Sequence, residues 1–91
     1  MTLLPKANWV CYLLRCADDT LYCGITNDLD KRLSAHNAGI AAKYTRSRGP
    51  VELMFTESCM DRSSASKREM EIKKLTRVEK LALIDSTRAL N

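Results

Sequence analysis

Two short apolar runs joined by a polar turn open the chain. Trp9 to Cys16 is apolar at nearly every position, which predicts a strand buried on both faces and central in its sheet. Ala17 to Thr20 has turn chemistry, and Leu21 to Ile25 follows as a second apolar run. The pattern therefore predicts a β-hairpin over this part of the chain.

A helix is expected directly after the hairpin. Thr26 or Asn27 can cap its first turn, and Leu29 and Leu33 are spaced to share its core-facing side. Gly39 is typical of a helix C-terminus, because glycine adopts the left-handed backbone conformation at little cost. The sequence thus predicts a helix that ends near Gly39.

The second half of the chain predicts a loop, a strand and two helices. Residues 40–50 are expected to be loop, and Val51 to Thr56 alternates as a strand does. A helix should begin near Asp61 to Ser64 and end near Leu75. Thr76-Arg77-Val78-Glu79 matches a capping box, so it should start a new helix.

The end of that last helix, from Ser86 to Asn91, is expected to fray. One side of the helix is expected to contact the core. The side is formed by Val78, Leu81, Ala82 and Asp85, widened by Leu83 and Ile84. The order β-β-α-β-α-α predicts an α+β fold, with a small, three-stranded, mostly antiparallel sheet flanked by helices.

Length and composition favour one domain over residues 1–91. No apolar run approaches the ~20 residues that span a bilayer, and the N-terminus lacks the order of a signal peptide. We therefore expect a cytoplasmic protein that does not enter a membrane. The four cysteines lack a C-x-x-C pair, which favours buried, reduced thiols over a zinc site.

The net charge of +4 is concentrated after the hairpin. Lys43, Tyr44, Arg46 and Arg48 form a short basic stretch with one aromatic residue. Such a stretch suits the phosphate backbone of a nucleic acid. The alternative is a solvated loop without a ligand.

Three polar residues are not explained by a core. Arg32 and His36 lie one helical turn apart at the edge of the expected buried face, where a histidine is either a structural residue with satisfied hydrogen bonds or a catalytic one. Glu69 falls on the apolar stripe that contains Ala65 and Ile72. A buried carboxylate is costly unless it is paired or binds a metal, so Glu69 is either a metal ligand or a partner of an arginine such as Arg32.

Tyr12 and Tyr22 stand on the two hairpin strands. They can serve one site only if they face the same side of the sheet. In an antiparallel hairpin the numbers of two paired residues always add up to the same sum, and two even-numbered residues share a face only if that sum is even. An even sum requires a loop with an odd number of residues, such as Asp18 to Thr20, or a bulge. We predict that register. The alternative is two tyrosines that only pack.

In this arrangement the chain resembles the GIY-YIG nuclease superfamily, and more closely its small stand-alone bacterial members of the URI branch. Tyr12 matches the tyrosine of the first signature, and Tyr22-Cys23-Gly24 matches the second. Arg32, His36 and Glu69 match the residues that follow on later helices. The resemblance spans about residues 8–84 and includes a Lys-Tyr-Thr-Arg loop at Lys43 to Arg46.

The resemblance implies an endonuclease that hydrolyses phosphodiester bonds in DNA with little sequence specificity, in DNA repair or recombination. Glu69 would hold one Mg²⁺ or Mn²⁺ ion, and Arg32 would bind a phosphate oxygen. One tyrosine, with its pKa lowered by the metal, His36 or Arg32, would deprotonate the attacking water; Tyr12 and Tyr22 are equal candidates. Gly24 would be structural at the site.

Further expectations concern the substrate. The basic residues Lys43, Tyr44, Arg46 and Arg48 would contact single- or double-stranded DNA, with Tyr44 as a stacking platform. Larger members of the family carry a DNA-targeting module, so a partner protein is expected to supply targeting. The competing interpretations are a nucleic-acid-binding module without catalysis and a protein-interaction domain.

Overall fold

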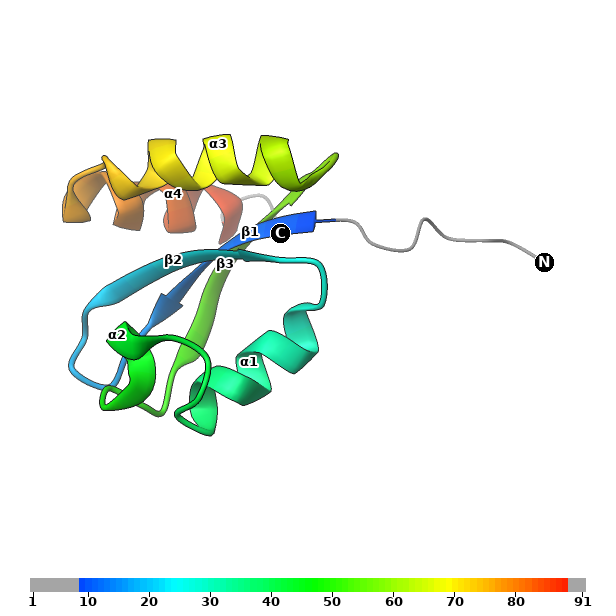
Figure 1. Ribbon diagram of the computed structural model, residues 1–91. Helices are drawn as coiled ribbons and strands as arrows, with labels where there is room; N and C mark the ends of the chain where they lie inside the picture. Colours follow the sequence, from blue (N-terminus) through cyan, green and yellow to red (C-terminus); the bar gives the residue numbers. More distant parts are fainter. Residues whose placement is uncertain (1–8, 89–91) are drawn as a thin grey trace.

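The computed structural model describes residues 9–88, whose three strands form one sheet with helices on both faces (Figure 1). The elements are β1 (Trp9–Arg15), β2 (Leu21–Thr26), α1 (Leu29–Asn37), α2 (Lys43–Arg46), β3 (Glu52–Cys59), α3 (Arg62–Lys73) and α4 (Arg77–Arg88). The predicted α+β order is confirmed. One short helix, α2, lies where only a loop was expected.

β1 is the central strand, as its two buried faces predicted. The order in the sheet is β2-β1-β3, and β1 is antiparallel to both neighbours. Tyr12 pairs with Gly24, and Leu14 pairs with Tyr22. The residue numbers of each pair add up to an even sum, so the predicted register is confirmed and the two tyrosines share one face of the sheet.

The turn that sets this register is one residue earlier than Asp18 to Thr20. The Cys16 N–H donates to the Thr20 carbonyl at 2.8 Å, which closes a three-residue loop over 17–19. Its last residue, Asp19, adopts φ 69°, the left-handed position typical of such loops. Asp18 stabilises the turn by accepting hydrogen bonds from the backbone and the hydroxyl of Thr20.

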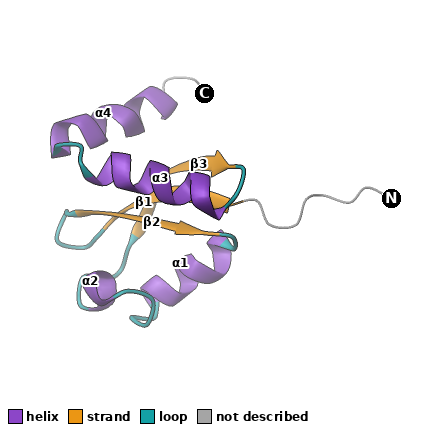
Figure 2. Cartoon of the chain, turned by 45° about the horizontal axis from the view of Figure 1, so that its top comes forward, coloured by secondary structure: helices purple, strands orange, loops and turns teal. Residues whose placement is uncertain are grey.

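Alternation along the strands divides the core into two clusters. Facing α3 and α4 are Cys11, Leu13, Cys23, Phe55, Ile72 and Ile84. Facing α1 and α2 are Tyr12, Leu14, Cys16 and Val51, with Leu29 and Leu33 packed against them. Figure 2 shows the sheet between the two groups of helices. Both tyrosines therefore lie on the α1 side.

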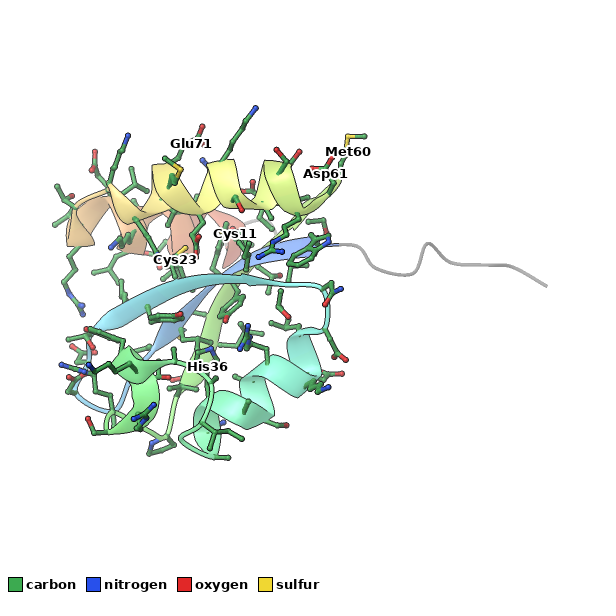
Figure 3. All side chains as sticks on the ribbon, in the orientation of Figure 1. Cys11, Cys23, His36, Met60, Asp61 and Glu71 are labelled. Atoms are coloured by element: carbon green, nitrogen blue, oxygen red, sulfur yellow. The ribbon has the colours of Figure 1, made fainter. Side chains whose placement is uncertain are left out.

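Cys11 and Cys23 lie between the sheet and α3, on the face opposite His36 (Figure 3). Their Sγ atoms are 3.7 Å apart, and both are free thiols. Cys16 is also buried, whereas Cys59 is half-buried. Burial raises the pKa of the Cys16 and Cys59 thiols, which keeps them protonated.

Helix ends follow the sequence signals with one correction. Asp28, rather than Thr26 or Asn27, caps α1: its carboxylate accepts the Lys31 N–H at 3.2 Å. The Thr26 hydroxyl instead accepts the N–H of Asp28 itself, so it supports the cap. Gly39 has φ 79°, which confirms the predicted stop.

The capping box is confirmed in both directions. The Thr76 N–H donates to the Glu79 carboxylate at 2.8 Å, and the Glu79 N–H donates to the Thr76 hydroxyl at 3.2 Å. This reciprocal pair starts α4 after α3 has ended, as the Thr-x-x-Glu pattern predicted.

The predicted inward side of α4 is wrong. Val78 is 75% exposed and Leu81 is 38% exposed, whereas Ile84 is 2% exposed and Lys80 is half-buried. The helix is rotated so that Lys80 and Ile84, one turn apart, face the body of the protein. The helix also continues through Ser86 to Arg88, so fraying there is not observed; residues 89–91 lie outside the described part.

No helix among the described residues is both long and apolar enough to cross a bilayer.

Candidate active site

Tyr12 is placed by the absence of a side chain at Gly24. The two residues are directly opposed, and Tyr12 is only 2% exposed. A Cβ at position 24 would lie 2.5 Å from the Tyr12 hydroxyl oxygen and 2.7 Å from Cζ, well inside contact distance. Glycine therefore leaves the space in which the phenol of Tyr12 lies.

A directed chain of hydrogen bonds leads away from that phenol. The Tyr12 oxygen is 2.9 Å from His36 Nε2, and His36 Nδ1 is 2.7 Å from the Thr45 hydroxyl. Thr45 donates its own hydrogen to the Ala42 carbonyl at 3.2 Å. Thr45 must then accept from Nδ1–H, which leaves Nε2 free to accept the Tyr12 proton.

Thr45 is the functional-site residue that the sequence did not reveal. It is 0% exposed and belongs to α2, inside the stretch that was expected to be a solvated or DNA-binding loop. The only available signal was its place in the Lys-Tyr-Thr-Arg motif. In the structure α2 carries the residue that fixes the imidazole of His36.

Tyr22 lies beside this chain rather than in it. Its ring centroid is 6.5 Å from that of Tyr12 and 5.2 Å from that of His36, and it stacks on Tyr44 at 5.9 Å with a 21° interplanar angle. Tyr22 is half-buried, so it is more accessible than Tyr12. The structure thus distinguishes two tyrosines that the sequence treated as equals.

Arg48 fastens α2 to the hairpin. Its guanidinium lies 4.1 Å from the centre of the Tyr44 ring, donates to Asp18 at 2.9 Å and donates to the Tyr44 carbonyl at 2.8 Å. Arg48 and the Tyr44 ring are therefore already engaged within the protein. Lys43 and Arg46, in contrast, extend from α2 as exposed residues.

Arg32 and Glu69 flank the tyrosines from helices on opposite faces of the sheet. Arg32 is exposed on α1 and lines a cavity of about 320 Å³ with Thr26, Asn27, Asp28, Lys31 and Ala35. The Glu69 side chain is 22% exposed, and its ion pair is with Lys73 at 3.4 Å, not with Arg32. Glu71, on the same helix, points away from the sheet (Figure 3).

Burial dominates the protonation of the site. It raises the pKa of Tyr12 and of Tyr22, although the charge of Arg32 opposes the shift in both. Burial, followed by the charge of Arg32, lowers the pKa of His36. At neutral pH both phenols are therefore protonated and His36 is neutral. Arg32 thus lowers the phenol pKa, as the sequence suggested, but burial outweighs it and the net shift of both phenols is upward.

Glu69 is the carboxylate whose charge reaches the two tyrosines. Its charge raises the pKa of both Tyr12 and Tyr22, so it lies within electrostatic reach of both phenols. Among residues 9–88 no group of three or more His, Cys, Asp or Glu side chains forms a metal cage. A single carboxylate suits Mg²⁺ or Mn²⁺, which take most of their ligands from water and substrate phosphate.

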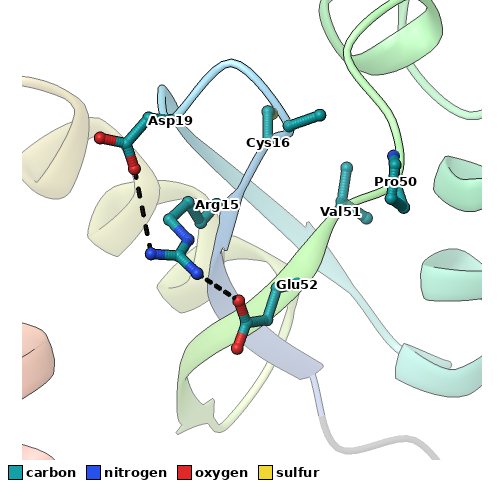
Figure 4. Close-up of a pocket in the computed structure, with 7 residues that line it drawn as sticks. Arg15, Cys16, Asp19, Pro50, Val51 and Glu52 are labelled. Carbon is teal, nitrogen blue, oxygen red and sulfur yellow. Dashed lines mark hydrogen bonds and ion pairs between the residues drawn. The ribbon is translucent and has the colours of Figure 1, made fainter.

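A separate cavity of about 260 Å³ lies at the turn end of the hairpin, beside the beginning of β3 (Figure 4). Arg15, which lines it, pairs with Glu52 at 2.7 Å and lies 3.9 Å from Asp19. Its charge is thus satisfied within the protein, and the cavity is not part of the tyrosine cluster.

Comparisons with known proteins identify the family of the chain. The GIY-YIG catalytic domain matches residues 8–82. A UPF0213 protein of Clostridium perfringens is 55% identical over 75 residues, covering 82% of this chain and 81% of its own. A UPF0213 protein of Desulfotalea psychrophila is 48% identical over 80 residues, covering 87% and 73%.

Two solution NMR structures are also similar. That of a UPF0213 protein from Bacillus halodurans has a TM-score of 0.56 at 40% identity, covering 86% of this chain and 83% of that one. That of an E. faecalis protein has a TM-score of 0.59 at 38% identity, covering 96% and 91%. The chain, with its tyrosine pair, its Gly24 and its matched residues 8–82, therefore belongs to the GIY-YIG catalytic domain family.

Proposed function

We propose that this protein is a divalent-metal-dependent endonuclease that hydrolyses phosphodiester bonds in DNA with little sequence specificity. The observation that supports this most strongly is the directed chain from Tyr12 through His36 to Thr45. Such a chain can take a proton from a phenol and hold the resulting imidazolium, as general base catalysis requires.

Tyr12 would be the residue that meets the attacking water. As the phenol oxygen removes a proton from water, its own proton passes to His36 Nε2. The imidazolium that forms keeps its Nδ1–H bond to Thr45. Hydroxide attacks phosphorus, and the bond to the leaving oxygen breaks. Tyr22, which has no such acceptor among the described residues, would orient the water or the phosphate.

Arg32 would bind a non-bridging phosphate oxygen, because the fixed donor fork of a guanidinium suits phosphate. Glu69 would hold one Mg²⁺ or Mn²⁺ ion, whose positive charge, when bound, stabilises the leaving oxygen. Lys43 and Arg46 would contact the DNA backbone from α2. We place this activity in the cytoplasm, in repair or recombination, with targeting supplied by a partner protein.

The test is Mn²⁺-dependent cleavage of labelled single- and double-stranded DNA by the wild type and by Glu69→Gln. Loss of a metal ligand should remove several kcal/mol of transition-state stabilisation, so cleavage should fall about a hundredfold or more. Binding of DNA should be retained. Glu71→Gln is the matched control, since it removes the same charge from the outer side of α3 and should cleave normally.

Cleavage that survives in Glu69→Gln, or that is lost equally in Glu71→Gln, would contradict the proposal. The second candidate function is a nucleic-acid-binding module without catalysis. The Glu69–Lys73 ion pair and the raised pKa of both phenols favour it. If the chain is such a module, the wild type and Glu69→Gln should both bind DNA and neither should cleave it. A chain that neither binds nor cleaves would fit a protein-interaction domain.

A further inference from the structure

Lys80 occupies a position that the core does not explain. It is half-buried on the inward side of α4, one turn before Ile84, whereas Val78 on the same helix is 75% exposed. Partial burial of a lysine side chain while a valine faces water is unusual packing for an amphipathic helix. The orientation of α4 therefore places a lysine, rather than an apolar side chain, against the body of the protein.

This lysine lines a cavity of about 270 Å³ beside the tyrosine cluster. The other lining residues are Leu21, Tyr22, Cys23, Tyr44 and Lys73. Figure 1 shows the geometry: at the beginning of β2, α2 lies on one side of the strand and the junction of α3 and α4 on the other. Residues from four separate segments of the chain thus meet at one end of β2.

The cavity carries excess positive charge. Lys80 has no ion pair with any residue in the described range, and the one ion pair of Lys73 is with Glu69. Both charges act at the cavity wall, since Lys73 and Lys80 each favour the thiolate form of Cys23.

The aromatic residues of the cavity favour an anion over a base. The Tyr44 ring already contacts Tyr22 and the Arg48 guanidinium, and the Tyr22 ring contacts Tyr44 and His36. Although Tyr44 is 38% exposed, these contacts leave less ring surface on which a nucleobase can stack. Ring edges carry partial positive charge and, together with two ammonium groups, they suit a phosphate.

We propose that this cavity, through Lys80 and Lys73, binds a phosphate group of the nucleic-acid strand that flanks the phosphate to be cleaved. The inference rests on the proposed nuclease function and adds the path of the substrate. The nucleic-acid strand would run along the unpaired edge of β2. It would begin at the Arg32 cavity at one end of β2, pass Tyr12 and Tyr22, and reach Lys80 at the other end.

The spacing of the two cavities fits this path. Tyr22 lines the Lys80 cavity and Thr26 lines the Arg32 cavity, both on β2, which is an edge strand. At about 3.3 Å per residue these positions are roughly 13 Å apart. That length corresponds to about two to four nucleotides, depending on how far the strand is stretched from its 3.4 Å stacked rise. A single strand follows such an edge more readily than a duplex.

The first test measures binding of a fluorescent single-stranded DNA 12-mer in EDTA, where no metal-dependent cleavage occurs. Lys80→Gln should weaken binding about fivefold at 0.1 M salt and reduce the slope of log K against log salt by about 0.7. Lys74→Gln is the matched control, because Lys74 is exposed at the end of α3 and outside the cavity. Lys80→Arg should retain most of the affinity.

The second test locates the contact. Single methylphosphonate linkages, which are neutral, are placed at each position of the 12-mer in turn. For the wild type, one position beside the cleaved linkage should lose about fivefold in affinity. In Lys80→Gln that position should lose clearly less than fivefold, since of the two lysines only Lys73 still faces the phosphate. Equal affinities of Lys80→Gln and Lys74→Gln, or a scan unchanged by Lys80→Gln, would overturn the proposal.

The two proposals can fail separately. If the wild type cleaves and Glu69→Gln does not, while Lys80→Gln binds like Lys74→Gln, the nuclease stands and the phosphate site is wrong. If binding depends on Lys80 but Mn²⁺ produces no cleavage, the site stands as part of a binding module. Absence of any DNA binding by the wild type overturns both.

Discussion

Replacing Gly24 with alanine should dislodge Tyr12. The added methyl group would lie 2.5 Å from the hydroxyl oxygen and 2.7 Å from Cζ. The ring has little room to retreat, because Tyr12 is 2% exposed and its hydroxyl is bonded to His36. Overpacking of this kind costs about 1–3 kcal/mol. An unpaired His36 Nε2 would add about 1–3 kcal/mol if the bond broke.

We therefore expect Gly24→Ala to lower the free energy of unfolding by about 3 kcal/mol. For a domain of this size that corresponds to a fall in Tm of about 12–24 °C. The measurement is urea denaturation followed by circular dichroism, with thermal melting as a second readout. Gly49→Ala is the control, since a Cβ at Gly49 meets nothing within 4 Å and should cause no comparable loss.

A double variant separates this clash from a general intolerance of alanine in β2. Tyr12→Leu removes both close atoms, so adding Gly24→Ala to it should cost less than about 1 kcal/mol. The reasoning is refuted if Gly24→Ala is as stable as the wild type. It is also refuted if the alanine costs the same in the presence and absence of the Tyr12 ring, because the two changes would then be uncoupled.

Three other predictions concern the hydrogen bonds and the pH dependence. Thr45→Val should lower the free energy of unfolding by about 1–3 kcal/mol, because the buried His36 Nδ1–H loses its acceptor. Thr45→Ser keeps the hydroxyl and should lose much less; urea denaturation measures both. The lowered pKa of His36 means that the unfolded chain binds a proton more readily. Stability should therefore be fully present above about pH 6.5 and decline as pH falls below it, and His36→Gln should flatten unfolding curves between pH 7 and 5. Thr76→Ala should cost about 0.5–2 kcal/mol by removing the cap of α4, and it should do so equally at pH 7 and 5.

Local signals in the sequence were sufficient for most elements. The apolar run of β1 identified the central strand, and the capping box at Thr76 identified the break between α3 and α4. Gly39 identified the end of α1. Each signal works because the physical cause is local: a strand buried on both faces has no polar positions, and a cap satisfies N–H groups within three residues.

The sequence was less informative where the outcome depends on how a helix is rotated about its axis or on the path of the chain. The apolar residues of α4 surround much of its circumference, so the sequence could not tell that Lys80 and Ile84 would face inward while Val78 faced water. Asp28 displaced Thr26 and Asn27 as the cap of α1, since all three side chains can accept an N–H and only the path of the chain selects one.

The sequence by itself predicted that Tyr12 and Tyr22 share one face of a hairpin, because register parity follows from the odd length expected of the loop, and the structure confirms it with a loop one residue earlier. It also indicated Arg32, His36 and Glu69 as candidate site residues, with a structural role as the alternative. Tertiary structure alone decided what these residues touch. Thr45 meets His36 in a segment that Arg48 links to the hairpin turn, through contacts that span up to 30 residues of sequence. Hydrogen bonds between residues so far apart in the chain leave no periodicity in a sequence. The donor-to-acceptor direction of the Tyr12–His36–Thr45 hydrogen bonds, and the cavity lined by Lys80, are therefore visible only in the folded protein.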